Sequence, residues 1–458
     1  MQTVKEFIAE NRENILRDMA RLVAVPSVKG PALPGAPYGE GPRNALNEGL
    51  AMAREMGFET YDAQGYLGWA QLPGKDPEKY IATITHMDVV PVGNGWDADP
   101  WTLREKDGWL LGRGIADDKG PSVLILYALK YIKESGMELK YPIRAIFGCD
   151  EECGMTDVEY YQANYPAPAF LFTPDAEFPL CNGEKGHFGG KICSPVCNGV
   201  ILDFEGGVAN NAVPDRAKAL VKVPVDKLKK TAGITLEAVD ENTTAVLGQG
   251  KSGHAALPEG TVNAIGLVVD CLLESGVCNE AENAYLKVLQ NLHKDYYGRG
   301  VGIQADDGKF TPLTIIGGVI SMKDGVICQT FDCRYVTTTD VETLTCQMEA
   351  ACGTAAHLEE VEGNACFYIE PDHPAIQALL DTYNQVTGRQ AQPFLMGGGT
   401  YARHFPCAVS YGPEVQDLVL PDFAGPMHGA NEGARFEDLL MGLEIYINAL
   451  LRLEELEL

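Results

Sequence analysis

Residues 80–91 read Y-I-A-T-I-T-H-M-D-V-V-P, and the first six of them form a short apolar run rich in β-branched side chains. Such a run predicts a buried β-strand, which places His86 immediately after the strand end. Two further runs of this kind, residues 143–147 and 169–172, are followed within a few positions by acidic side chains. In open α/β sheets, binding sites form outside the carboxyl ends of the strands. The sequence therefore predicts an α/β sheet with a polar site along one edge.

The polar residues near these strand ends, with two more from elsewhere in the chain, are of types that bind metal ions. They are two imidazoles and three carboxylates, namely His86, Asp117, Glu152, Asp175 and His428. This set can hold two divalent ions if one carboxylate is shared between them. One acid of the adjacent pair Glu151 and Glu152 is then left as a free carboxylate that can act on water. Spacing alone does not tell which of the two is the ligand, but the set indicates a two-metal hydrolase.

Each of these residues has a simpler explanation when it is taken alone. A single His is more often a hydrogen-bonded structural residue than a ligand, and acidic pairs are more often solvated loops or helix caps. We expect Asp118 to cap a helix, because Pro121 opens an apolar helical stretch just after it. We expect the Asp88 carboxylate to bond the far ring nitrogen of His86, because alternate residues of an extended chain project to one side. The metal hypothesis prevails because the candidates follow three separate strand ends.

Four motifs, in their order along the chain, resemble those of the dinuclear zinc peptidases of clan MH. The motifs are H-M-D-V-V-P, D-D-K-G, D-E-E and M-H-G-A-N-E, and they extend from about residue 80 to 435. Relatives in this clan include aminoacylase, carnosinase, succinyl-diaminopimelate desuccinylase and the bacterial dipeptidase V. The long-lid dipeptidases of the dipeptidase V type match best, because several lid motifs are also present. The resemblance implies an α/β zinc-exopeptidase catalytic domain with a mixed central sheet flanked by helices, plus an inserted α+β lid domain.

The resemblance also implies how the ligands divide between two Zn²⁺ ions per chain, for which Mn²⁺ or Co²⁺ would be substitutes. The shared ligand would be Asp117. His86 and Asp175 would complete the set around one ion, and Glu152 and His428 the set around the other. In this family a cis peptide often follows the bridging residue, which here is the bond between residues 117 and 118.

Three further groups receive catalytic roles from the resemblance. Glu151 would be the general base, and Asp88 would orient His86. His254, in G-K-S-G-H-A-A-L-P-E, matches the lid histidine that donates a hydrogen bond to the oxyanion. Taken alone, His254 would be interpreted as a loop histidine that caps a helix.

The residues that would bind the substrate lie in three segments, G-G-V-A-N-N-A-V-P-D, F-D-C-R-Y and G-G-G-T-Y-A-R. They are Asn211, Arg334, Gly398, Gly399 and Thr400. A guanidinium suits a substrate carboxylate because it can donate two parallel hydrogen bonds, although Arg334 alone could equally form an ordinary salt bridge on a strand. The glycine-rich run is not a phosphate loop, since no G-K-[ST] follows it. Departures from the family at Gly425 and Leu257 concern fine specificity.

The predicted organisation is a catalytic domain interrupted by an insertion. Residues 1–181 and 370–458 would form the catalytic domain, because they contain the candidate ligands and alternate helices with strands. Residues 182–369 would form the inserted lid, which is rich in short strand-like stretches with helical patches near 261–273 and 341–351. A lid of this length resembles that of the dipeptidase V relatives, which can supply the lid histidine within one chain. The carboxyl-terminal helix has an apolar stripe at three- and four-residue steps, formed by Leu439, Leu443, Ile447 and Leu450.

Composition and net charge restrict the partners and the cellular compartment that the sequence predicts. The formal charge of −28 over 458 residues argues against nucleic acid or an anionic membrane as a partner. No apolar run approaches the ~18 residues that a membrane span needs, and the amphipathic amino terminus has neither the core nor the cleavage site of a signal peptide. Thirteen cysteines without such a signal indicate reduced thiols in the cytoplasm. Cys149 and Cys153 flank the acidic pair, but we interpret them as packing residues because carboxylates already fill the site.

The sequence thus predicts a cytoplasmic two-zinc exopeptidase that hydrolyses dipeptides or short peptides with a free amino end. A deacylase of N-acyl amino acids is the alternative with the same metal chemistry. An inactive binding protein on the same fold is less favoured, because Glu151 and all five ligands are present. A small peptide is the expected partner, and we expect a monomer, with a homodimer as the alternative.

Overall fold

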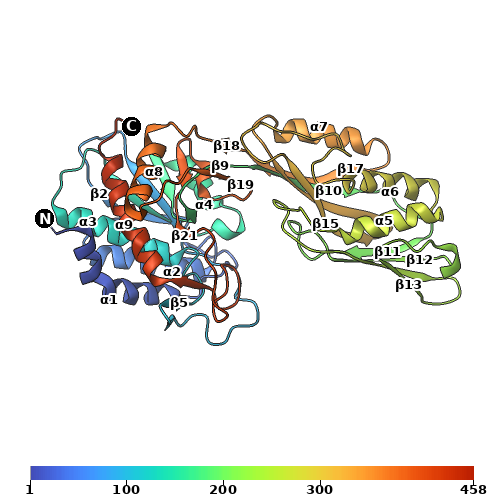
Figure 1. The fold of residues 1–458 in the computed structure, drawn as a ribbon, viewed down its shortest axis with the longest axis horizontal. Helices are drawn as coiled ribbons and strands as arrows, with labels where there is room; N and C mark the ends of the chain where they lie inside the picture. The colour runs from blue at the N-terminus through green and yellow to red at the C-terminus, as the bar shows by residue number, and fades with distance from the viewer. Residues whose placement is uncertain (1) are drawn as a thin grey trace. The chain divides into compact units, whose positions relative to one another are not determined.

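A computed structural model of the protein describes residues 2–458, and the chain separates into two compact units. The first unit comprises residues 2–183, Ile369–Phe394 and Gly399–Leu458, and the second comprises Glu184–Tyr368 and Leu395–Gly398. In Figure 1 the first unit contains the blue amino-terminal and red carboxyl-terminal parts of the chain. The sequence prediction assigned Leu395–Gly398 to the catalytic part. This segment instead pairs with the second unit, because the Lys185 amide donates to the Met396 carbonyl at 2.9 Å.

The first unit is built on a mixed β-sheet whose central strands are parallel. β3 (Ile81–His86) lies between β6 (Ile143–Gly148) and β7 (Phe170–Thr173) and is parallel to both. These strands agree with the three runs predicted from the sequence. The strands that extend the sheet, in the order β1-β2-β6-β3-β7-β20-β9, are β1 (Glu59–Ala63), β2 (Leu67–Leu72), β20 (Ala408–Ser410) and β9 (Cys181–Glu184). The predicted α/β class, with a mixed central sheet, is confirmed.

The helices of the first unit bury their apolar faces around this sheet. They are α1 (Val4–Val23), α2 (Glu40–Glu55), α3 (Lys119–Ser135), α4 (Thr156–Asn164), α8 (Pro374–Thr387) and α9 (Phe436–Leu453). α9 packs against α3 and α8 (Figure 1), and all four residues of its predicted stripe are buried. α3 is apolar nearly all round because it also packs against α1 and β3.

Two small sheets bring the later part of the chain to the ends of the central strands. β4 (Arg104–Lys106) and β5 (Trp109–Leu111) form a hairpin, and β22 (Gly433–Arg435) pairs with β5. β8 (Ala176–Phe178) pairs in parallel with β21 (Pro413–Val415). These pairings place the segment around residue 430 beside the segment that precedes α3, although more than 300 residues separate them.

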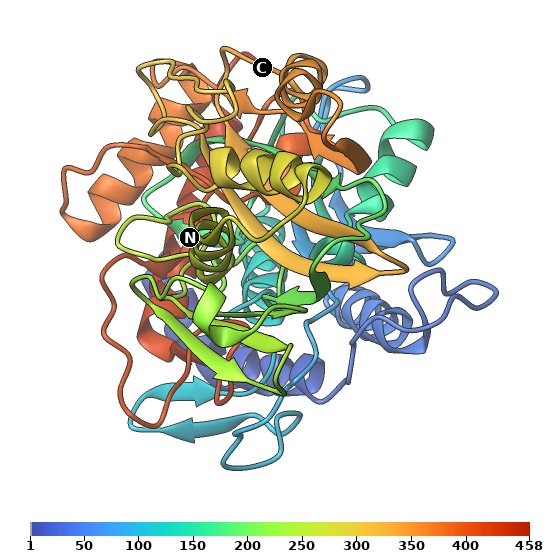
Figure 2. The same cartoon turned by 90° about the vertical axis from the view of Figure 1, so that its right-hand side faces the viewer.

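The second unit is an antiparallel sheet with helices joined to it by one apolar core. Its helices are α5 (Ala264–Ser275), α6 (Glu280–Leu292) and α7 (Val341–Cys352). α6, which packs against β15, was not predicted from the sequence (Figure 2). In sheet order the strands are β13 (Ile234–Ala238), β14 (Thr244–Gln249), β12 (Arg216–Val221), β11 (Ile201–Gly206), β15 (Thr314–Lys323), β16 (Val326–Tyr335), β10 (Gly186–Cys193) and β17 (His357–Asn364).

The prediction that all cysteines are thiols is wrong for one pair. Cys193 on β10 and Cys328 on β16 form a disulfide, and the two residues lie directly opposite each other in the antiparallel pairing. They are 135 residues apart in sequence, so only the strand register brings them together. The other cysteines that the structure describes form no disulfide, and Cys149 is buried as predicted whereas Cys153 is exposed.

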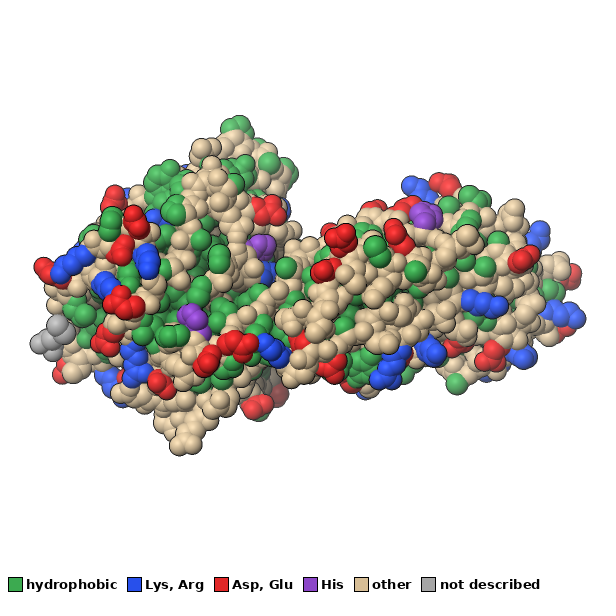
Figure 3. Space-filling view, turned by 90° about the horizontal axis from the view of Figure 1, so that it is seen from above, with side chains coloured by type: hydrophobic (Ala, Val, Ile, Leu, Met, Phe, Trp, Pro, Cys, Tyr) green, Lys and Arg blue, Asp and Glu red, His purple; other side chains and the backbone are tan. Residues whose placement is uncertain are grey.

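Acidic and basic side chains are both spread over the visible surface of each unit (Figure 3). The acids outnumber the bases, 64 to 36, which is the origin of the strongly negative charge. Between residues 2 and 458, no helix has both the length and the apolar character needed to cross a membrane.

Candidate metal centre

The six residues predicted to form the metal centre come together at one edge of the first unit's sheet. His86 is the last residue of β3, and Asp175 follows β7 by two positions. Glu151 and Glu152 open a short 3-10 turn, Glu151–Cys153, after β6. Asp117 lies in the loop that precedes α3, and His428 lies in the loop before β22. Parallel strands that end at one edge thus position four of the six side chains, as expected for an open α/β sheet.

Asp117 lies between the two imidazoles. Its Oδ1 is 2.8 Å from Nε2 of His86, and its Oδ2 is 2.8 Å from Nε2 of His428. Near the same Nε2 atom of His86 lies a second acidic oxygen, Oδ2 of Asp175, at 3.8 Å. Near Nε2 of His428 lies Oε2 of Glu152, at 3.1 Å. The geometry therefore divides into two groups that share one carboxylate, in the arrangement that the sequence predicts for two metal ions.

The chemistry of these donors fits divalent cations. Ligand atoms of His86, Asp117 and Glu152 lie within 4.8 Å of one another, and so do those of His86, Glu151 and Asp175. Burial and the Asp117 carboxylate raise the pKa of Asp175 to about 8. Oε1 of Glu152 is buried and has no hydrogen-bond partner among residues 2–458. Imidazole nitrogens and carboxylate oxygens are ligands for Zn²⁺ and Mn²⁺, and a cation here would offset the repulsion among the carboxylates.

Glu151 differs from its neighbour Glu152 in its surroundings. Burial, followed by the charge of Asp175, raises the pKa of Glu151 well above its usual range. Unlike Glu152, it forms no ion pair with either imidazole in the part of the chain that the structure describes. A carboxyl group with a raised pKa beside a metal centre is suited to accept a proton and release it again near neutral pH.

Asp88 acts through different atoms from those predicted. Nδ1 of His86 donates to the backbone carbonyl of Asp88 at 2.9 Å, while the carboxylate is 3.6 Å from that nitrogen. The carboxylate instead accepts from the backbone amides of Glu151 and Glu152, at 3.3 and 3.2 Å. The prediction assumed an extended chain beyond His86, but β3 ends at that residue. Asp88 therefore orients His86 through its backbone and holds the acidic turn in place through its side chain.

The helix-capping role predicted for Asp118 is also wrong, because its carboxylate binds a different backbone amide. Asp118 is the N-cap residue of α3, but its side chain makes no capping hydrogen bond within the described chain. Its Oδ2 accepts from the backbone amide of His86 at 3.1 Å, which ties the end of β3 to this loop. α3 begins at Lys119, two residues before Pro121. The cis peptide expected between residues 117 and 118 is present.

Glu432 is a supporting residue that the sequence analysis did not assign. Its buried carboxylate accepts from the backbone amides of Gly114, Ala116 and Asp117 and from Nη1 of Arg113 at 2.6 Å. These bonds fix the loop that carries the bridging carboxylate. The signal was present in the sequence, because Glu432 ends the M-H-G-A-N-E motif, but the motif alone does not show which backbone a carboxylate will bind.

A second buried carboxylate holds the backbone just before the turn that carries Glu151 and Glu152. Oδ2 of Asp157, at the start of α4, accepts from the amides of Cys149 and Asp150 and from the hydroxyl of Tyr401. Lys29 pairs with Asp150 at 2.5 Å, which adds a further link to the same turn. The Glu151 and Glu152 side chains thus project from a backbone that is hydrogen-bonded on both sides.

Part of the predicted substrate-binding set gathers in the second unit around His254. The Ala255 amide donates to the carbonyl of Asn211 at 2.9 Å, so the two segments lie side by side. Nδ1 of His254 accepts from the Ala256 amide at 3.2 Å, which leaves the proton of the neutral ring on Nε2. Partial burial, and then the charge of the Arg334 guanidinium, lower the pKa of His254, which favours the neutral ring. His254 caps no helix, because α5 begins ten residues later.

Arg334 is already ion-paired, and the glycine-rich segment is divided between the two units. Arg334 donates to both oxygens of Asp332, at 2.8 and 3.0 Å, which is the strand salt bridge considered as its alternative role. Its Nη1 also donates to the carbonyl of Gly397, so Gly398 belongs to the same unit. Gly399 and Thr400 belong to the first unit, where the buried Thr400 hydroxyl lies 2.9 Å from that of Ser410. The five predicted substrate residues are therefore divided between the two units.

Comparisons with known proteins agree with one another. The model of the peptidase family M20/M25/M40 matches residues 82–452. The Beta-Ala-Xaa dipeptidase of Lactobacillus delbrueckii subsp. lactis is 30% identical, and the alignment covers 98% of each chain. The structure of human carnosine dipeptidase 1 superposes with a TM-score of 0.58 at 14% identity, over 99% of each chain. An M20 family metallo-carboxypeptidase from Sulfolobus solfataricus superposes with a TM-score of 0.59 at 14% identity, over 96% of this chain and 99% of the other. At these identities the two structures show a shared fold.

Proposed function

The chain belongs to the peptidase family M20/M25/M40, and from this premise we propose that it is a two-zinc dipeptidase. The proposed reaction is hydrolysis of the amide bond of dipeptides or short peptides with a free amino end. The observation that carries the proposal is the position of Asp117, whose two oxygens each lie 2.8 Å from a different imidazole. The similarity to a Beta-Ala-Xaa dipeptidase over nearly the whole chain supports the substrate class.

The side chains of the metal centre have different roles in the proposed reaction. Two Zn²⁺ ions held by the five ligands would polarise the scissile carbonyl and acidify the attacking water. Glu151 takes the proton from that water and passes it to the leaving amine. Asp88 keeps Glu151 within reach of the ligands, because its carboxylate accepts from the amides of Glu151 and Glu152.

Residues of the second unit would act on the substrate. Nε2 of His254 carries the proton that an oxyanion needs, and its neutral ring donates without adding charge. Arg334 would bind the substrate carboxylate, and the other residues of that subsite would be Asn211, Gly398, Gly399 and Thr400. Arg334 is held by Asp332, so its guanidinium is oriented before a substrate arrives.

We also propose that the enzyme works as a monomer in the cytoplasm. Small peptides are its partners, and neither nucleic acid nor membrane is involved. The formal charge of −28 supports the exclusion of nucleic acid and of anionic membranes, because a negative surface repels polyanions.

The proposed function is tested with zinc-loaded protein and matched pairs of substrates. Unblocked dipeptides should be hydrolysed, and the same dipeptides with an acetylated amino group should be hydrolysed poorly. Amino-acid release is measured for both, and the assay is repeated with Mn²⁺ and Co²⁺. Release of amino acids from the acetylated compounds alone would favour the deacylase instead. Absence of turnover with every metal would favour an inactive binding protein.

Substitution of His254 by alanine is expected to lower kcat more than substrate affinity. An oxyanion donor acts mainly in the transition state, and its loss costs about 10²–10³-fold in rate. Steady-state kinetics of the variant and the wild type, at equal zinc content, give the two effects separately.

The same variant tests whether His254 acts within its own chain. His254→Ala protein is mixed with Glu151→Ala protein, each inactive alone. If His254 serves its own metal centre, the mixture stays inactive, because every site lacks one group. Recovery of activity on mixing would show that the histidine serves a neighbouring subunit and would contradict the monomer.

A further inference from the structure

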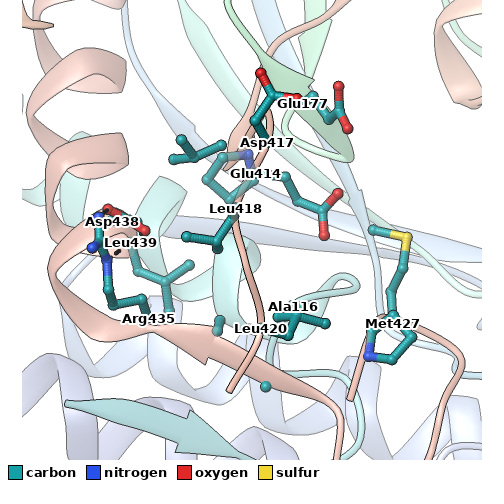
Figure 4. A pocket seen from close by; sticks show the side chains of 15 residues that line it. Ala116, Glu177, Glu414, Asp417, Leu418, Leu420, Met427, Arg435, Asp438 and Leu439 are labelled. Carbon is teal, nitrogen blue, oxygen red and sulfur yellow. Dashed lines mark hydrogen bonds and ion pairs between the residues drawn. The ribbon is translucent and has the colours of Figure 1, made fainter. Parts of the chain in front are cut away.

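A cavity of about 250 Å³ lies in the first unit and has no part in the mechanism above (Figure 4). Its lining includes Ala116 and Met427. These residues are the direct chain neighbours of the ligands Asp117 and His428. The charges of Asp117 and His428 act on the carboxyl group of Glu414, which also lines the cavity, so the cavity lies near the candidate metal centre.

One part of the cavity wall is apolar. Val415 contributes from the end of β21, Leu418 and Leu420 from the chain that follows it, and Leu439 from the first turn of α9. In Figure 4 the labelled leucines lie on the side of the cavity toward α9, away from Glu177 and Met427. A wall of this kind favours an aliphatic or aromatic group over a polar one, because burial of apolar surface is favourable.

The other part of the wall carries two acidic side chains that have no positive partner among residues 2–458. Glu177 and Glu414 lie opposite each other in the parallel pairing of β8 with β21. Neither side chain forms a hydrogen bond or an ion pair with any residue from 2 to 458. The one arginine in the lining, Arg435, is already paired with both oxygens of Asp438. The cavity thus combines apolar volume with two acidic groups that lack a positive partner, and burial together with the neighbouring Glu177 raises the pKa of Glu414 to about 7.

We propose that this cavity receives the amino-terminal residue of the substrate, with its free ammonium group against Glu414 and Glu177 and an apolar side chain against Leu418, Leu420 and Leu439. This inference rests on the proposed function and names a preferred substrate class, dipeptides with a large apolar first residue.

The covalent structure of a dipeptide suits this placement. The α-ammonium group is two bonds from the scissile carbonyl, so it stays near the metal centre when that carbonyl is attacked. Its side chain branches from the same carbon and can follow the cavity away from the centre. An N-acyl substrate lacks the positive charge and would leave both carboxylates without a partner in a partly buried space, which disfavours its binding.

Kinetics of Glu414→Gln protein test the charge. The substrates are Leu-Gly, Gly-Gly and N-acetyl-Leu-Gly, and Glu437→Gln, an exposed acid on α9 outside the cavity, is the matched control. Because hydrogen bonds to charged groups are strong, kcat/KM for Leu-Gly should fall roughly 10- to 100-fold in Glu414→Gln at unchanged zinc content. The preference for free over acetylated substrate should fall with it. The control should match the wild type.

The apolar wall is tested with Leu418→Ala. A few methylenes in an apolar pocket change selectivity by about tenfold or more, so the ratio of kcat/KM for Leu-Gly to that for Gly-Gly should fall by at least that factor. Unchanged ratios in both variants, with a wild type that cleaves dipeptides, would overturn the cavity assignment alone. Better cleavage of Lys-Gly than of Leu-Gly would also overturn it, since the acids would then bind a side chain. A wild type without dipeptidase activity would overturn the proposed function itself.

Discussion

Replacement of Glu151 by alanine is expected to reduce kcat by about 10²–10⁴-fold while both zinc ions stay bound. Glu151 forms no ion pair with His86 or His428 among the described residues, and in the proposed mechanism it is the base and not a ligand. Its raised pKa comes from burial and from the nearby Asp175, which are the conditions under which a carboxyl group exchanges a proton near neutral pH. The measurement is turnover of a dipeptide together with metal analysis of the same purified sample.

Glu159→Ala is a suitable control for this experiment. Glu159 is an exposed acid on α4 in the same unit, and its loss should change neither turnover nor metal content. If the Glu151 variant keeps its turnover, or loses one equivalent of zinc, the proton is moved by another group or Glu151 is itself a ligand.

Replacement of Asp117 by alanine is expected to weaken both metal sites and to reduce activity to background. The two oxygens of Asp117 face different imidazoles, each at 2.8 Å, so the substitution removes one ligand from each group. His428→Ala should weaken one site, because His428 faces Asp117 and Glu152 but is not paired with Asp175 in the described structure. Zinc titration after chelation gives the number of sites and the affinity of each.

Comparison of the zinc titrations of Asp117→Ala and His428→Ala decides whether Asp117 is shared by two metal sites. A single weakened site in both proteins would remove Asp117 from the bridging position. Thermal unfolding of the apo proteins should accompany the titration, because the amide of Asp117 is also hydrogen-bonded to Glu432 and its loop must remain folded.

The candidate ligands that the structure brings together could be singled out from the sequence because most of them lie close to a recognisable local signal. His86 follows an apolar run that forms β3, and Asp175 follows the run that forms β7. The edge of a parallel sheet then gathers such residues without further information. His428 was found from its motif, since no strand signal precedes it.

The errors concern contacts that depend on backbone direction. The roles of Asp88 and Asp118 were inferred from spacing along an extended chain or at a helix start. In the structure both carboxylates accept from backbone amides of segments that are distant in sequence. Spacing describes a side chain's direction only while the secondary structure continues, and both residues lie where it ends.

The sequence by itself determined the fold class, and it singled out the candidate metal ligands that the structure brings together. It did so because apolar periodicity and chemically distinctive side chains are local properties of the chain. The tertiary structure decided which oxygen of Asp117 faces which imidazole, that Glu432 holds the bridging loop, and that Cys193 meets Cys328. These features depend on strand register and on the pairing of segments that lie from 31 to more than 300 residues apart. Such pairings are set by the packing of the whole core, so no single stretch of sequence specifies them.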